Sequence, residues 1–169
     1  MEVSLIVHDI RSIHNVGSLL RTAEGMGVDK VFFSGYTPYP RTPDDDRLPH
    51  IISKLSLQIN KTALGAETMV NWEHCDDVSL LIKDLKAQGV MVCALEQTTD
   101  SVSLPDFRPD GPVALLLGRE VEGIEPGILK LCDTVLEIPM FGQKESFNVV
   151  QAAAMALYQM CVLGQQTKL

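Results

Sequence analysis

Three short segments of the sequence combine glycine with polar and charged side chains in patterns that suit ligand binding or catalysis. They are Asn15–Arg21 (NVGSLLR), Gly118–Gly123 (GREVEG) and Ile138–Asn148 (IPMFGQKESFN). Each segment stands where a predicted strand or loop leads into a predicted helix. Open α/β sheets place their ligands at such junctions, so we expect the segments to contribute to a site.

The first segment predicts a helix with Asn15 as its N-cap, because apolar residues follow at the spacing of one helical face. Those residues are Val16, Leu19, Leu20 and Ala23. In one interpretation, Gly17 permits close packing and Arg21 only solvates an exposed face. In the other, the helix N-terminus presents backbone N–H groups to a phosphate and Arg21 adds a planar cation. Spacing alone leaves both interpretations open.

The second segment follows Val113–Leu117, an apolar run of the kind that a parallel sheet buries on both faces. A glycine at the carboxyl end of a strand, here Gly118, lets a flat ligand approach the backbone. The segment is not a dinucleotide fingerprint, because the chain has no G-x-G-x-x-G pattern. An ordinary turn between a strand and a helix is the alternative interpretation.

The third segment has neither strand nor helix periodicity and precedes the last predicted helix, Val149–Leu163. It combines Ile138-Pro-Met140, a glycine at position 142 and Ser146-Phe-Asn148. Ser146 or Asn148 is able to cap the following helix, so a structural role stands beside a binding role.

The remaining sequence predicts the elements that position these segments. The predicted strands are Val3–Val7, Val31–Phe33, Met69–Trp72, Val90–Leu95, Val113–Leu117 and Thr134–Ile138. Helices are predicted from Asn15, from Asp76 or Asp77 to Gly89, near Pro126–Leu131 and over Val149–Leu163. We therefore expect one α/β domain over residues 1–169, with a mostly parallel sheet of five or six strands.

Residues 35–60 differ from the rest, since they hold several prolines and the run Asp44-Asp-Asp46. This composition predicts a long loop with at most short structure. Such a loop is either a solvated excursion or a functional contact.

Composition limits the function. The formal net charge of −8 argues against a broad nucleic-acid surface, because phosphate binding rests on lysine and arginine. A local basic patch remains compatible with it. The candidate residues are Arg11, Arg21, Arg41, Arg47, Lys54, Lys61, Arg119 and Lys144.

Cysteine and histidine usage adds two expectations. The four cysteines contain no C-x-x-C pair, which favours a cytoplasmic protein. The four histidines lack zinc-ligand spacing, so we expect no metal site. No apolar run approaches the roughly 18 residues of a membrane span.

Taken in this order, the three segments resemble the motifs of the SPOUT superfamily of RNA methyltransferases, in its SpoU-like branch that methylates the ribose 2′-hydroxyl. Thr22-Ala-Glu-Gly-Met-Gly27 lengthens the match of the first motif. Val121 departs from the common family form, which often has a glycine there. The resemblance covers nearly the whole chain.

The resemblance implies an α/β fold with a C-terminal trefoil knot, in a catalytic domain without an appended RNA-binding domain. It implies S-adenosylmethionine as the cofactor, transfer RNA or ribosomal RNA as the substrate, and a homodimer with no membrane or metal partner. Carried onto this chain, it makes the cofactor-binding candidates Leu95, Gly118, Ile138, Met140, Ser146 and Phe147. Arg21 would be the central catalytic residue, and the site would be shaped by Asn15, Glu120, Ser146 and Asn148.

Elementary chemistry limits the role of Arg21. A free guanidinium has a pKa above about 12 and stays protonated, so it is a poor general base. Positioning the ribose and stabilising charge in the transition state is the role we favour for it.

Two other functions remain open. One is a catalytically silent RNA-binding or assembly factor on the same fold. The other, from the architecture alone, is a flavodoxin-like regulator or a nucleotide-binding domain, although the chain lacks an acidic cluster or phosphate loop after its first strand.

Overall fold

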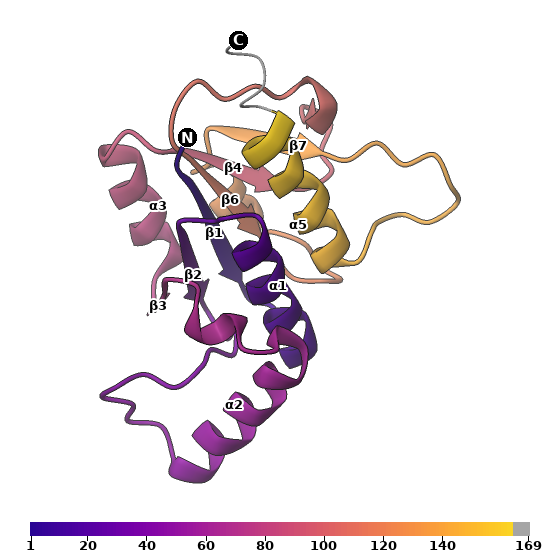
Figure 1. Cartoon of the computed structure of the whole chain (residues 1–169). Helices are drawn as coiled ribbons and strands as arrows, with labels where there is room; N and C mark the ends of the chain where they lie inside the picture. Colours follow the sequence, from indigo (N-terminus) through magenta and orange to yellow (C-terminus); the bar gives the residue numbers. More distant parts are fainter. Residues whose placement is uncertain (164–169) are drawn as a thin grey trace.

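Seven parallel strands form the sheet of the computed structural model, which describes residues 1–163 (Figure 1). Their order across the sheet is β3-β2-β1-β6-β4-β7-β5. The strands are β1 (Val3–His8), β2 (Lys30–Ser34), β3 (Trp72–Cys75), β4 (Met91–Leu95), β5 (Val102–Ser103), β6 (Val113–Leu117) and β7 (Thr134–Glu137). All carboxyl ends therefore lie along the same edge of the sheet.

The centre of the sheet is buried on both faces. Every residue of β1 and of β6 is buried, and the two strands pair in register from Val3 opposite Val113 to Val7 opposite Leu117. Parallel strands with helices on both faces require such continuous apolar runs. This explains why the run Val113–Leu117 in the sequence coincides with a strand.

Helices cover the two faces (Figure 1). One face is covered by α1 (Ile13–Gly25) and α5 (Val149–Tyr158), with α2 (Pro49–Ala63) packed against α1, and the other by α3 (Val78–Ala87) and α4 (Pro126–Leu129). Three short elements complete the fold: the 3-10 helices η1 (Ala66–Thr68) and η2 (Leu104–Asp106), and a π-helical turn, η3 (Gln159–Leu163), which continues α5. Among the described residues, no helix combines the length and the apolar character that a membrane span requires.

Close packing joins α1 to α2 at Gly17. A Cβ atom on Gly17 would lie 2.4 Å from the carbonyl oxygen of Ile59 and 2.2 Å from Thr62 Oγ1. Thr62 Oγ1 also donates a hydrogen bond to the carbonyl oxygen of His14, at 2.9 Å. Gly17 thus has the packing role that its first interpretation assigned to it.

The structure corrects several expected elements. Within residues 1–163 the sheet has seven strands, because the two-residue β5 pairs with β7. The predicted strand Met69–Trp72 is instead Trp72–Cys75. Residues 35–60 are not one long loop, since a helix of 15 residues begins at Pro49. Proline at the first position of a helix leaves no backbone hydrogen bond unmade, so this proline starts the helix.

The helix α1 also begins earlier than predicted. Its N-cap is Ser12, whose side chain accepts a hydrogen bond from the backbone N–H of Asn15. Asn15 is therefore inside the first turn, and its side chain is available for a contact outside the helix. The predicted cap Asp77 of α3 and the start of α5 at Val149 are confirmed.

The packing at Gly17 generates a stability prediction. Gly17→Ala should lower the free energy of unfolding by about 1–3 kcal/mol, because the added methyl group meets the backbone of α2. Urea unfolding followed by circular dichroism measures this change. The matched control in the same helix is Gly25→Ala, where a Cβ atom meets nothing within 4 Å. A variant at Gly17 as stable as the control would contradict the close packing of α1 on α2.

Candidate active site

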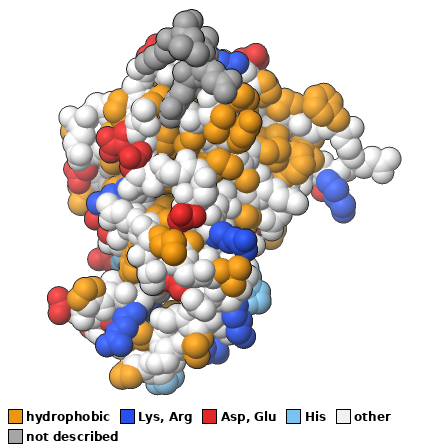
Figure 2. All heavy atoms as spheres, viewed as in Figure 1, with side chains coloured by type: hydrophobic (Ala, Val, Ile, Leu, Met, Phe, Trp, Pro, Cys, Tyr) orange, Lys and Arg blue, Asp and Glu red, His pale blue; other side chains and the backbone are white. Residues whose placement is uncertain are grey.

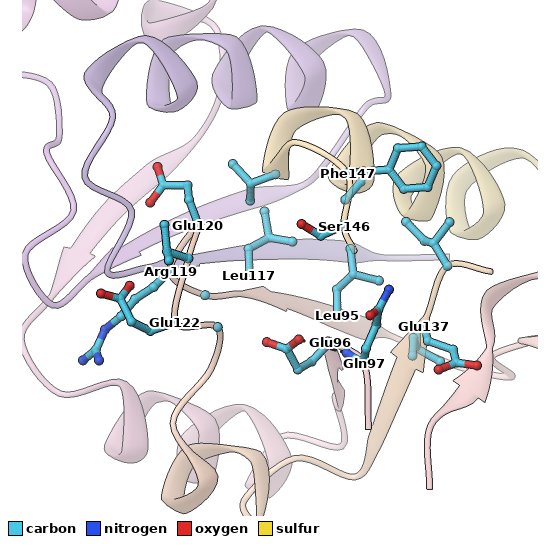
Figure 3. Close-up of a pocket in the computed structure, with 17 residues that line it drawn as sticks. Leu95, Glu96, Gln97, Leu117, Arg119, Glu120, Glu122, Glu137, Ser146 and Phe147 are labelled. Carbon is cyan, nitrogen blue, oxygen red and sulfur yellow. Dashed lines mark hydrogen bonds between the residues drawn. The ribbon is translucent and has the colours of Figure 1, made fainter. Parts of the chain in front are cut away.

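A pocket of about 200 Å³ opens at the carboxyl ends of β4, β6 and β7, beside the start of α5 (Figure 3). Its apolar lining includes Leu95, Leu117, Leu136, Ile138, Val149 and Ala152. Its polar lining includes Glu96, Gln97, Arg119, Glu120, Glu122, Glu137 and Ser146. An apolar slot with a few polar groups at its rim is the usual form of a small-molecule site.

The turn that follows β6, Gly118–Gly123, forms one wall of the pocket. A Cβ atom on the buried Gly118 would lie 2.4 Å from Ile124 Cγ1 and 3.0 Å from the backbone nitrogen of Ile124. The backbone N–H of Gly123 donates to the carbonyl oxygen of Arg119, at 3.2 Å, and closes the turn. The absence of a side chain at Gly118 is therefore required by the turn itself.

Glu96 joins this turn to the end of β4. Its carboxylate accepts hydrogen bonds from the backbone N–H groups of Ile124, at 3.0 Å, and Gln97, at 2.9 Å. A Cβ atom on Gly123, which has φ +72°, would lie 2.2 Å from Glu96 Oε2. Sequence reasoning missed Glu96, although its place directly after the strand residue Leu95 was a usable signal.

Glu120 joins the same turn to α1. Its carboxylate accepts hydrogen bonds from Asn15 Nδ2 at 3.2 Å, from the backbone N–H of Ser12 at 3.3 Å and from that of Arg11 at 3.4 Å. A negative charge is favourable at a helix N-terminus. The backbone N–H groups of Arg11 and Ser12, directly before α1, are thus engaged by a carboxylate of the chain itself.

Arg119 joins the turn to Asp9, the residue directly after β1. Its Nε and Nη2 atoms donate to Asp9 Oδ2 at 3.2 and 3.0 Å, and its guanidinium also pairs with Glu125. These hydrogen bonds raise the pKa of the guanidinium above its usual value. Asp9 is buried, has φ +57°, and accepts a further hydrogen bond from the backbone N–H of Tyr36.

His8 lies beside this ion pair. Its Nε2 atom is 3.5 Å from Asp9 Oδ2, and its Nδ1 atom shares a hydrogen bond of 2.8 Å with Ser34 Oγ. Burial lowers the pKa of His8 below its usual value, and the nearby Asp9 opposes this shift. Sequence reasoning missed Asp9 and His8, because nothing in the local pattern links them to a residue more than 100 positions away.

The third predicted segment contributes unequally to the pocket. Ile138, Ser146 and Phe147 line it, and the ring of Phe147 turns away from Leu117 (Figure 3). Asn148 caps α5, because its Oδ1 atom accepts a hydrogen bond from the backbone N–H of Val150 at 2.9 Å. Met140 is half-buried and does not line the pocket.

Arg21 lies outside the pocket. It is exposed on α1, six residues or about 9 Å along the helix axis from Asn15. Within residues 1–163 its side chain makes no hydrogen bond or ion pair that we observe. The pocket therefore brings together Leu95, Gly118, Glu120, Ile138, Ser146 and Phe147, with Asn15 linked to it, and leaves out Met140, Asn148 and Arg21. Over the same described residues, no group of three or more His, Cys, Asp or Glu is arranged to hold a metal ion.

The chain is similar in sequence to one protein family and to several characterised proteins. Residues 2–158 match the family model described as the SpoU rRNA Methylase family. The chain is 30% identical over 153 residues to the 23S rRNA (guanosine-2′-O-)-methyltransferase RlmB of Neisseria meningitidis serogroup B, covering 90% of this chain and 55% of the relative. It is 26% identical over 158 residues to the tRNA (guanosine(18)-2′-O)-methyltransferase of Escherichia coli K12, covering 94% and 62%. It thus spans little more than half the length of such relatives.

Solved structures share the fold. The TrmH/SpoU tRNA modifying enzyme of A. aeolicus matches with a TM-score of 0.80 at 20% identity, over 99% of this chain and 77% of that one. An AdoMet-bound rRNA methyltransferase from Sinorhizobium meliloti matches with a TM-score of 0.79 at 22% identity, over 99% and 57%. A third structure, whose description concerns the 2-OH methylation of C/U34 on tRNA, matches with a TM-score of 0.78 at 20% identity, over 99% of this chain and 98% of that one.

The ion pair between Arg119 and the buried Asp9 generates a second prediction. Asp9→Asn keeps a side chain that tolerates a positive φ but removes the charge that faces Arg119, so the free energy of unfolding should fall by about 1–3 kcal/mol. Urea unfolding at neutral pH measures the loss. Glu125→Gln is the control, because its side chain is 54% exposed and an exposed partner should matter by less than about 1 kcal/mol. Equal losses in the two variants would show that the buried partner is not the stabilising one.

Proposed function

The chain belongs to the SpoU rRNA methylase family, and from this premise we propose that it transfers a methyl group from S-adenosylmethionine to a ribose 2′-hydroxyl of a structured RNA, either transfer or ribosomal RNA. One observation carries the proposal. The three segments that resemble the family motifs are connected around one pocket at the strand ends, through Gly118, Ile138 and the contact of Glu120 with Asn15. We take the residues that line it as the cofactor-binding candidates.

The residues of the pocket fit S-adenosylmethionine chemically. Leu95, Leu117 and Ile138 offer apolar surface for the adenine ring. The carboxylates at the rim, Glu120, Glu122 and Glu137 among them, favour a cationic ligand. The volume of about 200 Å³ is below the roughly 300–1,000 Å³ of typical ligand sites, so the ligand would extend along the exposed residues 141–148.

In this proposal the cofactor supplies an activated methyl group, because its sulfonium is positively charged. The chain supplies position. Asn15 is held by Glu120 at the start of α1, and Ser146 lies at the pocket beside the start of α5. These polar groups would orient the ribose, and Arg21 would hold the adjacent phosphate with its planar fork of donors.

We further propose the trefoil knot and the homodimer that the family resemblance implies. The sheet order supports the knot: β7 lies between β4 and β5, which residues 96–101 connect directly. A groove of apolar and small side chains beside α5, which includes Met26, Leu104 and Met155, supports the dimer. Since Arg21 lies outside the pocket of its own chain, a second copy would have to bring its Arg21 to that pocket.

The cofactor proposal predicts binding that depends on the pocket. Isothermal calorimetry should detect S-adenosylmethionine or its demethylated product bound to the wild-type protein. Gly118→Val should abolish binding, and Ile138→Trp, which fills the pocket without altering the turn at Gly118, should do the same. A thermal melt of both variants separates lost binding from lost folding. Wild-type protein that binds nothing at millimolar ligand would contradict the cofactor.

The role of Arg21 predicts a separation of binding from turnover. Arg21→Ala should leave the affinity for S-adenosylmethionine intact and lower single-turnover methyl transfer roughly a hundredfold or more, because a positioned charge is lost. Arg21→Lys should rescue little, since the planar fork is absent. Wild-type rates in both variants would return Arg21 to its role as a solvated surface residue.

Mixing variants tests whether two copies share each site. Co-expressed Arg21→Ala and Ile138→Trp chains form a mixed dimer in which one pocket and the arginine that serves it are both intact. About a quarter of the wild-type activity should return, since half of the dimers are mixed and each has one complete site. Activity no higher than that of either parent would contradict the shared site.

A further inference from the structure

Helix α2 carries positive charge in an acidic chain. The 15 residues of Pro49–Ala63 include His50, Lys54 and Lys61 but no aspartate or glutamate, whereas the whole chain has a net charge of −8. His50, Lys54 and Lys61 are all exposed. They follow one another at intervals of four and seven residues, which places them on one face of the helix.

Neighbouring acids do not neutralise this face. Lys30 pairs with Glu73 and Lys86 pairs with Asp133, but within residues 1–163 neither Lys54 nor Lys61 forms an ion pair. The acidic residue that follows the helix, Glu67, accepts hydrogen bonds from Asn60 and from the backbone N–H of Gly65. Its carboxylate is therefore already engaged. The charges of both lysines remain available to a ligand.

The apolar side chain of Leu57 is exposed on the same face. Leu57 is 68% exposed and stands between Lys54 and Lys61, at three and four residues from them. The opposite face of α2 buries Ile52 and Ile59, which is enough to hold the helix on the domain. Packing thus explains the buried residues of α2 and leaves Lys54, Leu57 and Lys61 without a structural role.

The face is connected to the candidate active site through α1. Thr62, next to Lys61, donates its hydroxyl to the carbonyl oxygen of His14, and the following residue, Asn15, is bonded to Glu120 at the pocket. From this contact α2 extends beyond the sheet (Figure 1). The spheres of Lys, Arg and His gather over this end of the molecule in Figure 2. An extended polyanion with one nucleotide near Asn15 would be able to reach α2.

We infer that the face of α2 formed by His50, Lys54, Leu57 and Lys61 is a docking surface for the phosphate backbone of the RNA substrate, at a distance from the nucleotide that is methylated. The inference rests on the proposed function and adds where the RNA is held. RNA is the occupant that the charge complementarity favours, since each phosphate neutralised by lysine releases a counterion. Because the contact is to phosphate, it carries no sequence preference of its own.

The test compares two pairs of lysines on opposite sides of the sheet. The double variant Lys54→Gln/Lys61→Gln removes the charges of α2. The matched control, Lys83→Gln/Lys130→Gln, removes two exposed lysines on α3 and directly after α4, which cover the other face. Fluorescence anisotropy with labelled bulk transfer RNA, and separately with fragments of ribosomal RNA, gives the dissociation constant over a range of salt concentrations.

The α2 variant should bind RNA about tenfold more weakly at low salt, and the slope of log K against log salt should become shallower by about 1.5, because two cations are lost. The control should match the wild type in both quantities. Lys54→Arg/Lys61→Arg should retain binding, and the affinity for S-adenosylmethionine should not change in any variant. A lower kcat/KM with unchanged turnover at saturating RNA would accompany the weaker binding.

The opposite outcomes are distinct from failure of the proposed function. A protein that binds S-adenosylmethionine and RNA but loses equal affinity in the two double variants overturns the assignment to α2. Wild-type protein that binds S-adenosylmethionine but neither RNA sample overturns this assignment together with the proposed RNA substrate. The assignment is also overturned if Lys54→Gln/Lys61→Gln weakens binding of the protein to vesicles of anionic lipid but leaves its affinity for RNA unchanged. Absence of cofactor binding, by contrast, contradicts the methyltransferase itself.

Discussion

The candidate site depends on one turn, Gly118–Gly123, and on the three contacts that hold it. Arg119 attaches the turn to the buried Asp9, directly after β1, and Glu120 attaches it to the start of α1. Glu96, directly after β4, accepts a hydrogen bond from the N–H group of Ile124, which follows the turn. Each contact involves an ionised side chain, and such hydrogen bonds are stronger than neutral ones. These contacts consequently fix the position of the start of α1 relative to the pocket.

Parts of this arrangement were predictable from the sequence. The apolar run Val113–Leu117 is a strand with those bounds, and six of the proposed site residues line one pocket. Local patterns carry such information, because buried strands and strand-to-helix junctions have short-range signatures. The partnership of Arg119 with Asp9 joins residues 110 positions apart, so no local pattern contains it. The prolines before α2 led to the prediction of a loop in place of this helix. Asn15 was predicted as the N-cap of α1, whereas the cap is Ser12.

Charge is distributed unevenly over the molecule, which reconciles its acidity with the proposed RNA substrate. Several carboxylates line the pocket, among them those of Glu122 and Glu137. Helix α2, in contrast, contains two lysines and no aspartate or glutamate. A cationic cofactor and a polyanionic substrate would each meet a surface of opposite charge. In our account α1 lies between the two surfaces, with Asn15 near the pocket and Gly17 packed on α2.

A crystal structure of the protein with S-adenosylmethionine tests the central claim most directly, because the claim concerns where the cofactor binds. Our account predicts the ligand at the carboxyl ends of β4, β6 and β7, in contact with Leu95, Gly118 and Ile138. The contacts of Glu120 with Asn15 and of Arg119 with Asp9 should be retained. A ligand bound away from these strand ends would contradict the account. So would a bound ligand in whose presence the contact between Arg119 and Asp9 is broken.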